Sequence, residues 1–246
     1  MIERHFAKLR ARGLLSEDEE HAIRNAVAEI RTVPADAVVV PAYEVQDHST
    51  LLLDGILCRY KDLRNGQLQI TELHVAGDFA DLHSFTLKYL DHDVMSLTPA
   101  RLAIVPHTAL RDLTERFPSL ARSYWFSTNL DAAIHREWEL SLGRRSASAR
   151  VAMLLSELHQ RLFLVGLADA AGYELRLTQT DIAECTGLTN VSVNRVLRDL
   201  RERGAVLFAA GRVKILDRAA LWRAAEFDPR YLYLDGAAGK RIEQFT

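Results

Sequence analysis

The stretch LTQTDIAECTGLTNVSVNRVLRDLRERGAV, residues 177–206, constrains the fold more than any other part of the sequence. Thr178 followed three residues later by Asp181 resembles a capping box, with Asp in place of the usual Glu or Gln, and predicts the start of a helix. Gly187 is placed to end that helix, and Thr189 is a second N-cap candidate. The stretch therefore predicts two short helices joined by a tight turn.

The second of these helices is amphipathic. It runs without Gly or Pro until Gly204, and its apolar residues Val193, Val196, Leu197 and Leu200 recur at the spacing of one buried stripe. Any amphipathic helix can simply expose its charged face to water. Here the opposite face combines amide, hydroxyl and guanidinium groups, which can bond base edges and phosphates in a major groove. Within a helix-turn-helix, this mixture favours DNA binding.

The following stretch, AVLFAAGRVKILD, predicts a hairpin with strands at about 206–209 and 212–216, joined at Ala210 and Gly211. Such a hairpin is the wing of a winged helix. Its basic residues Arg212 and Lys214 are positioned to meet phosphates, although basic hairpin residues are as often only solvated. The predicted DNA-binding residues are Thr178, Gln179, Thr189, Asn190, Val191, Ser192, Asn194, Arg195, Arg198 and Arg212.

Length and composition place the chain among ordinary globular proteins. With 246 residues, of which 48% are hydrophobic, one or two domains are expected. The N-terminus MIERHFAKLRARGLL has charges throughout and no apolar core of a secretory signal, and no run is apolar enough to span a bilayer. Cys58 and Cys185 are too few for a disulfide framework or a Cys-rich metal site. We expect a cytoplasmic protein without a membrane partner.

Charge is distributed unevenly along the chain. The formal net charge is −2, but residues 144–225 carry 13 Lys and Arg against 8 Asp and Glu, a net charge of +5. The remainder therefore has a net charge of −7. This asymmetry indicates that the C-terminal part contacts a polyanion while the rest has another role.

The N-terminal half predicts one helix followed by a β-rich region. Residues 16–30, SEDEEHAIRNAVAEI, have helical patterning after a Ser and an acidic first turn. From Thr32 to about Pro106, short apolar runs alternate with turn signals, and Asn65-Gly66 is a strong hairpin signal. We predict a jelly-roll or barrel of roughly 75 residues.

A long helix is predicted over residues 118–143, which contain no internal Gly or Pro. Leu130, Ile134, Trp138 and Leu142 line one stripe at four-residue spacing. A helix of about 26 residues spans roughly 39 Å, longer than a small domain needs, so a partner helix is expected. The alternative is that the helix packs wholly within its own chain. Another helix is predicted from Ser146 or Ser148 to Leu164.

In this order of elements the chain resembles the Crp/Fnr family of bacterial transcription regulators, from about residue 16 to residue 225. The resemblance is carried by LTQTDIAECTGLTNVSVNRVLRDLRERG with its wing, by VAGDFADL in the β-rich region and by RFPSLARSYW at the long helix. It implies an α+β fold: an N-terminal double-stranded β-helix (a jelly-roll, cyclic-nucleotide-binding-like domain), a long dimerisation helix and a C-terminal winged helix-turn-helix. The implied domains are a sensor at 1–116, the helix at 117–145, the DNA-binding domain at 146–225 and a C-terminal extension at 226–246.

The family also implies partners and an assembly. A homodimer joined along the long helix, through Leu130, Ile134 and Trp138, would bind a palindromic promoter site in double-stranded DNA. It would recruit or block RNA polymerase.

The resemblance breaks down at the residues that bind an effector. Cyclic-nucleotide-binding members carry a Gly-Glu pair for the ribose and an Arg-Ser or Arg-Thr pair for the phosphate, whereas here Ala80-Asp81 and Asp91-His92 stand near those places. A carboxylate repels a phosphate, so we expect that cyclic AMP does not control this chain. By an ungapped count, His135 and Arg136 stand where the nucleobase is read. The candidate effector residues are Asp81, His83, Asp91, His92, His135 and Arg136.

Other modes of action have weaker support in the sequence. The cysteine cluster of oxygen-sensing relatives is missing, because four thiolates are needed and the chain has two cysteines, so an iron–sulfur site requires sharing between chains. Asp81, His83, Asp91, His92 and Asp93 fit no standard metal signature, so a regulator gated by a metal or another small ligand remains the alternative. A more remote alternative is an enzyme using the β-roll, and another is a winged helix that binds protein. No Walker loop, zinc-helix pattern or nucleophile motif is found, so no catalytic residue and no cofactor are assigned.

Overall fold

The computed structural model describes residues 2–13 and 15–234, and contacts divide the chain into two compact units. One unit comprises residues 1–61 and 72–132, and the other comprises residues 62–71 and 133–246. Helix α5, Pro118–Arg144, contributes residues to both. Within the described part of the chain, no helix has the length and apolarity that a membrane crossing requires.

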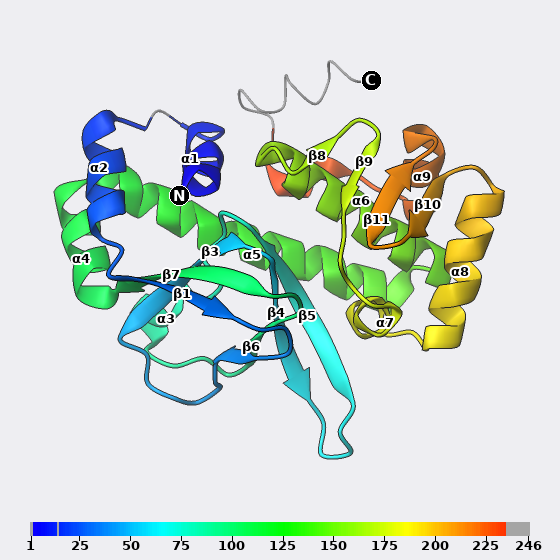
Figure 1. Cartoon of the computed structure of the whole chain (residues 1–246), viewed down its shortest axis with the longest axis horizontal. Coiled ribbons are helices and arrows are strands. Elements are labelled where there is room, and N and C mark those ends of the chain that lie inside the picture. Colours follow the sequence, from blue (N-terminus) through cyan, green and yellow to red (C-terminus); the bar gives the residue numbers. More distant parts are fainter. Residues whose placement is uncertain (1, 14, 235–246) are drawn as a thin grey trace. The chain divides into compact units, whose positions relative to one another are not determined.

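The first unit is a β-roll built from two sheets (Figure 1). Leu52 and Leu102 from one sheet pack against Leu57 and Val94 from the other, and all four are buried. The predicted jelly-roll is confirmed. The three-stranded sheet has the order β1 (Glu29–Val33), β7 (Ala100–Pro106), β3 (His48–Asp54), and the four-stranded sheet has the order β2 (Val38–Val40), β6 (Asp93–Ser96), β4 (Ile56–Asp62), β5 (Leu68–Val75).

Helices close one end of this β-roll, where α1, α2 and α4 gather in Figure 1. Phe6 of α1, Ile23 of α2, Leu110 of α4 and Tyr124 of α5 share one buried cluster with Phe79. The helices are α1 (Glu3–Arg10), α2 (Glu17–Asn25), α3 (Ser84–Leu87) and α4 (His107–Arg116).

The helix predicted over residues 16–30 is correct at its start and wrong at its end. Ser16 caps α2, with its side chain accepting from the Glu19 N–H at 3.2 Å, but α2 stops at Asn25. Residues 29–33 instead form β1, which pairs with β7 so that Ile30 lies opposite Ala103. Pairing with a strand that lies 67 to 75 residues farther along the chain outweighs a helical pattern whose last turn has no buried face.

The second unit is a winged helix-turn-helix. Its sheet has the order β10 (Val206–Ala209), β11 (Arg212–Ile215), β9 (Gly172–Glu174), β8 (Ala168–Asp169). Its helices are α6 (Ala147–Leu164), α7 (Gln179–Thr186), α8 (Asn190–Glu202) and α9 (Arg218–Ala225), followed by the 3-10 helix η1 (Pro229–Leu232). The predicted hairpin strands and the helix opened by Ser146, whose side chain accepts from the Ala149 N–H, are confirmed.

A buried carboxylate joins three elements of this unit. Glu157 of α6 is fully buried and accepts from Trp138 Nε1 of α5 at 3.1 Å, from Arg161 Nη1 at 3.0 Å and from the Tyr231 hydroxyl of η1 at 2.7 Å. Burial raises the pKa of Glu157, and these donors oppose that rise. The segment after α9 is therefore bound to α6 through Glu157, which also binds α5. The rest of the predicted extension, residues 235–246, lies outside the described residues.

Candidate nucleic-acid interface

Local hydrogen bonds set the geometry of the helix-turn-helix. Thr178 Oγ1 accepts from the Asp181 N–H at 3.1 Å, and Asp181 Oδ2 accepts from the Thr178 N–H at 2.6 Å, which completes the predicted capping box. Gly187 ends α7 with a φ of 61°, a left-handed conformation that favours glycine. Thr189 then caps α8 by accepting from the Ser192 N–H at 3.2 Å. The turn between the helices is thus specified by residues at its two ends.

Packing decides which face of α8 reaches solvent. Val193, Val196, Leu197 and Leu200 are buried, as the spacing predicts. The opposite face is exposed, and Val191 keeps 79% of its surface accessible. A large apolar side chain in that position offers a contact surface for a partner.

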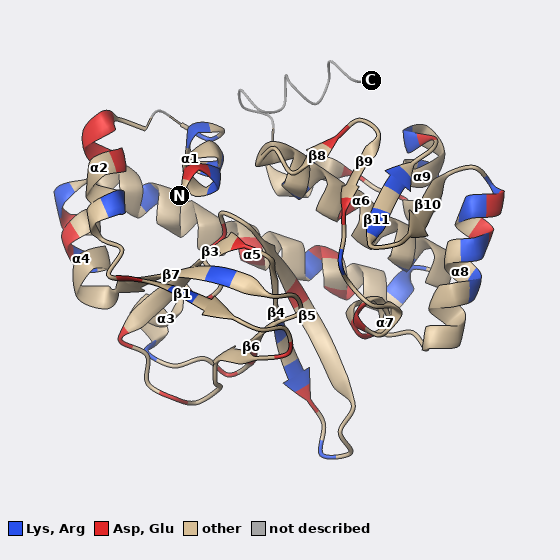
Figure 2. Cartoon of the chain, viewed as in Figure 1, with Lys and Arg blue, Asp and Glu red and all other residues tan. Residues whose placement is uncertain are grey.

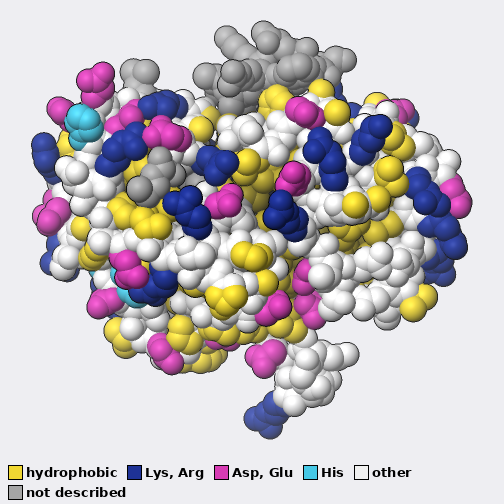
Figure 3. Space-filling view, in the orientation of Figure 1, with side chains coloured by type: hydrophobic (Ala, Val, Ile, Leu, Met, Phe, Trp, Pro, Cys, Tyr) yellow, Lys and Arg dark blue, Asp and Glu magenta, His cyan; other side chains and the backbone are white. Residues whose placement is uncertain are grey.

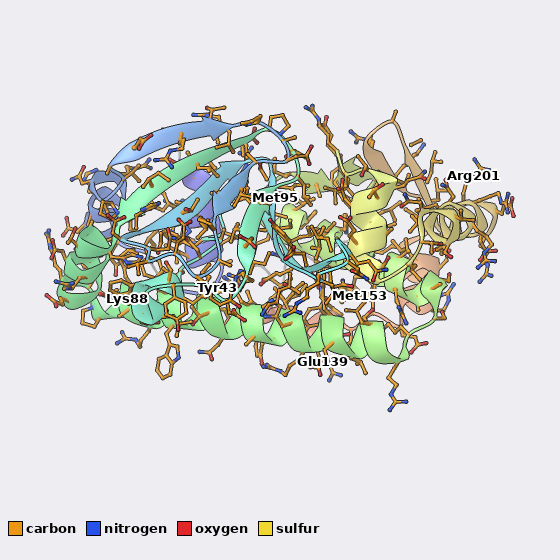
Figure 4. All side chains as sticks on the ribbon, turned by 90° about the horizontal axis from the view of Figure 1, so that it is seen from below. Tyr43, Lys88, Met95, Glu139, Met153 and Arg201 are labelled. Carbon is orange, nitrogen blue, oxygen red and sulfur yellow. The ribbon has the colours of Figure 1, made fainter. Side chains whose placement is uncertain are left out.

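The exposed face of α8 borders a hollow of about 580 Å³ between α7, α8 and β10. Figure 2 shows basic residues in blue along α8, and Figure 3 shows a band of basic side chains on the surface at this helix. Arg201 projects from α8 in Figure 4. The lining residues are Gln179, Val191, Asn194, Arg195, Leu197, Arg198, Arg201, Leu207 and Phe208.

Three guanidinium groups of this surface are available to an anion. Arg195, Arg198 and Arg201 are exposed, and none of them forms an ion pair with a described residue. By contrast, Arg203 is bound to Asp199 with an N–O distance of 2.7 Å. Arg201 was missing from the predicted set, although it follows Arg198 by three residues and so shares its side of the helix.

The neutral residues of the predicted set divide into two groups. The side chains of Thr178, Thr189 and Ser192 are engaged in the caps. Asn190 and Asn194 are exposed on α8: Asn190 Nδ2 donates to Thr180 Oγ1 at 3.1 Å, and Asn194 Nδ2 donates to the Asn190 carbonyl at 3.2 Å. Gln179 is also exposed and opens α7, and Arg212 is exposed on β11 of the wing.

Comparisons with known proteins identify this architecture. Residues 149–224 match the model of the Crp-like helix-turn-helix domain. The nitrogen fixation regulation protein FixK of Bradyrhizobium diazoefficiens is 31% identical over 170 residues, which cover 68% of this chain and 70% of that protein. The chain belongs to the Crp/Fnr family of transcription regulators. It is a DNA-binding regulator, and the predicted family and fold are confirmed.

Further similarities extend over most of this Crp/Fnr regulator. The transcriptional activator protein FnrL of Cereibacter sphaeroides is 25% identical over 218 residues, 86% of each chain. The solved structure of FixK2 from Bradyrhizobium japonicum superposes with a TM-score of 0.73 at 25% identity, covering 80% of this chain and 97% of that one.

The β-roll of the Crp/Fnr regulator contains a buried cation that sequence reasoning missed. Arg59 of β4 is only 2% exposed and donates to the Ala80 carbonyl at 3.0 Å, to Glu72 Oε2 at 2.7 Å and to Asp131 Oδ2 of α5 at 2.8 Å. Burial disfavours its charge, but the two carboxylates raise the pKa of Arg59 above its ordinary value. A lone Arg in the apolar run ILCRYKD is the only signal of this network in the sequence.

Two of the candidate effector residues lie next to this network. Asp81 is fully buried and accepts from the Thr50 N–H at 2.5 Å, and burial raises the pKa of its carboxyl to about 7. His83 lies 3.4 Å from Arg59 Nη2 through Nδ1 and stacks on His92. Burial, reinforced by the Arg59 charge, lowers the pKa of His83 to about 2, so this ring is neutral.

The remaining effector candidates have different surroundings. Asp91 is exposed and accepts from Lys61 Nζ at 2.8 Å and from His92 Nδ1 at 2.9 Å, and the bond from Lys61 is the main reason that its pKa is lowered. His135 is half-buried and Arg136 is exposed on α5. Asp81 is therefore buried, whereas Asp91 is exposed to solvent. Among the described residues, no group of His, Cys, Asp and Glu is arranged to hold a metal ion.

The predicted dimerisation stripe needs a correction. Ile134 and Trp138 are 1% and 4% exposed within a single chain, and Leu130 is half-buried. Side chains that are already buried by their own chain offer no surface to a second copy, so Ile134 and Trp138 were assigned wrongly.

Another face of α5 is exposed instead. Trp125 and Leu140 keep 70% and 50% of their surface accessible, and Glu139 lies on the outward side of α5 in Figure 4. The exposed residues recur at alternating three- and four-residue spacings, which is the heptad pattern of a helix that pairs with another helix. They are Arg122, Trp125, Asn129, Ala132, Arg136, Glu139 and Gly143, with Leu140 beside them.

Proposed function

We propose that this Crp/Fnr regulator binds a palindromic promoter site as a homodimer and that it does so without cyclic AMP. The observation that carries the DNA-binding part is the exposed face of α8, where Arg195, Arg198 and Arg201 have no anionic partner among the described residues. DNA is a polyanion that also presents base edges, and guanidinium groups without an anionic partner can bind both.

The residues of α8 divide between base and phosphate contacts. Val191 cannot accept a hydrogen bond but can pack on a thymine methyl, while Arg195 can donate two bonds to a guanine. Arg198 and Arg201 lie farther along the helix and Arg212 lies on the wing, where phosphate contacts are expected. The half-site is therefore expected to contain a thymine and a guanine at positions set by Val191 and Arg195.

A second copy is expected along the exposed face of α5. Its heptad spacing suits a two-stranded coiled coil, in which Trp125 and Leu140 supply apolar contact and Ala132 and Gly143 allow close approach. A symmetric pair of winged domains would read a palindromic site, since one winged domain buries too little DNA surface for operator affinity.

Independence from cyclic AMP follows from the charges of the β-roll. A bound phosphate needs positive partners to offset its desolvation. Arg59 is already bound to Glu72 and Asp131, and Lys61 is bound to Asp91. A cyclic nucleotide would have to break these pairs to reach either cation, so we propose that the 1–116 domain does not take cyclic AMP.

RNA polymerase is part of this proposal. FnrL and other relatives are named transcriptional activators, and an activator bound at a promoter requires contact with the polymerase. We propose a cytoplasmic location for the same reason, because a transcription regulator acts at the chromosome.

Binding to a library of genomic fragments, followed by anisotropy titrations of a selected fragment at several salt concentrations, tests the proposal. We expect selective binding without added nucleotide and a steep loss of affinity with salt. Arg201→Ala should weaken binding on every sequence and reduce the salt slope by about 1, while Arg195→Ala should cost about 1–3 kcal/mol and relax specificity at one symmetric position.

Arg203→Ala is the matched control, because Arg203 directly follows α8 as its C-cap residue but is paired with Asp199 and does not line the hollow. It should leave the salt slope unchanged. Equal losses for Arg201→Ala and Arg203→Ala would contradict the assignment of the hollow as the DNA-binding surface.

A further inference from the structure

A hydrogen bond connects the two helices of the helix-turn-helix on their exposed side. Asn190 is the first residue of α8 and Thr180 lies in the first turn of α7, and Asn190 Nδ2 donates to Thr180 Oγ1 at 3.1 Å. Both side chains are exposed. The amide of Asn190, one of the predicted DNA-binding residues, is thus held by a residue of the other helix.

Thr180 has no other bonding role in the described part of the chain. The capping of α7 is performed by Thr178 with Asp181, and the capping of α8 is performed by Thr189 with Ser192. Among the described residues, the hydroxyl of Thr180 forms a hydrogen bond only with Asn190. Its loss would leave both helix caps intact.

This bond determines what Asn190 can offer to a base. A carboxamide has two N–H donors and one carbonyl acceptor. With one N–H held by Thr180, one donor and one acceptor remain. Adenine presents one acceptor, N7, and one donor, the N6 amino group, in the major groove. Guanine presents two acceptors, N7 and O6, and would need both N–H groups.

A second contact supports the same arrangement. Asn194 Nδ2 donates to the carbonyl of Asn190 at 3.2 Å, one turn farther along α8. The backbone of Asn190 is therefore held from α8 while its side chain is held from α7.

We infer that Thr180 is a positioning residue for base recognition, which holds the Asn190 carboxamide so that Asn190 selects adenine over guanine. This inference rests on the proposed DNA recognition by α8. Thr180 of α7 would then contribute to sequence specificity without touching a base itself.

The test compares Thr180→Val, which removes the hydroxyl at nearly constant volume, with Thr180→Ser, which retains it. Half-site selection with the full-length protein first locates the position whose preference disappears in Asn190→Ala. Competition titrations then give the ratio of affinities for adenine and guanine at that position. We expect the wild type to prefer adenine. Thr180→Val should reduce the ratio of affinities by about fivefold to tenfold, the change expected for the loss of one hydrogen bond. Thr180→Ser should preserve it.

Two readouts separate this role from a structural one. The melting temperature and the affinity for non-specific DNA should be the same in Thr180→Val and the wild type, because only the base ratio depends on the held amide. An unchanged ratio in Thr180→Val, or a guanine preference in the wild type, would overturn the positioning role of Thr180. It would leave the proposed DNA binding by α8 intact. Failure of the wild type to bind any DNA selectively would overturn the proposed function as well.

Discussion

The buried carboxyl of Asp81 should make the stability of the β-roll depend on pH. Asp81→Asn replaces it by an isosteric amide, which keeps an oxygen to accept from the Thr50 N–H and carries no titratable proton. In the folded chain burial raises the pKa of Asp81 from 3.8 to about 7. The carboxyl is therefore protonated in the folded state at pH values where it is ionised in the unfolded state.

The sign and size of the effect follow from linkage. Between pH 4 and pH 7 the folded state binds the extra proton, so the free energy of unfolding falls as pH rises. Each unit of pKa difference corresponds to about 1.4 kcal/mol, so a difference of about three units amounts to roughly 4 kcal/mol. Above pH 7 both states are ionised and the dependence on this group ends.

Urea unfolding at several pH values, followed by far-ultraviolet circular dichroism, measures this difference. We expect the free energy of unfolding of Asp81→Asn, minus that of the wild type, to rise by about 1.4 kcal/mol per pH unit from pH 4 to pH 7 and then to level off. Asp91→Asn is the control: Lys61 lowers the pKa of Asp91, so the stability that its ionised form contributes is lost only below its ordinary pKa, and the difference for Asp91→Asn should stay flat from pH 4 to pH 7. A difference for Asp81→Asn that stays flat over this range would refute the argument.

Three further outcomes are expected. Trp125→Glu should give monomers in sedimentation experiments, because Trp125 is exposed. Ile134→Ala should lower the melting temperature and leave the dimer intact, because Ile134 is buried in its own chain. Dissociation by Ile134→Ala alone would restore the stripe predicted from the sequence. Calorimetry with cyclic AMP should show no binding, and micromolar binding coupled to a tenfold gain in operator affinity, about 1.4 kcal/mol, would contradict the proposal. Tyr231→Phe should lower the free energy of unfolding by about 1–3 kcal/mol, because buried Glu157 loses a donor; an unchanged value in chemical denaturation would show that water replaces the hydroxyl.

Local signals explain why the helix-turn-helix could be predicted residue by residue. The caps at Thr178 and Thr189 and the left-handed Gly187 act within a few residues, so the sequence contains all the information that their geometry needs. The end of α2 could not be predicted in this way. Residues 29–33 become a strand only because β7, far along the chain, offers them an edge.

The sequence also does not reveal which side of α5 packs within its own chain. Periodicity indicates that Ile134 and Trp138 share one side of the helix, but it does not indicate whether that side meets the same chain or a second copy. Trp138 donates to Glu157 of α6, a contact that no pattern within α5 reveals. The Arg59 network was hidden for the same reason, since Glu72 and Asp131 reach it from other elements.

Glu157 has a consequence for how this protein can be divided or recombined. Its carboxylate depends on Trp138 from before α6 and on Tyr231 from after α9. A DNA-binding fragment cut at residue 146 would separate the carboxylate from Trp138, and a chimera that takes only residues 146–225 from this chain would separate it from both donors. The smallest transferable module therefore starts within the second half of α5 and extends through η1. Loss of Glu157 alone would leave Trp138 Nε1 and the Tyr231 hydroxyl without their acceptor, so substitutions in related chains are expected to alter the three residues together.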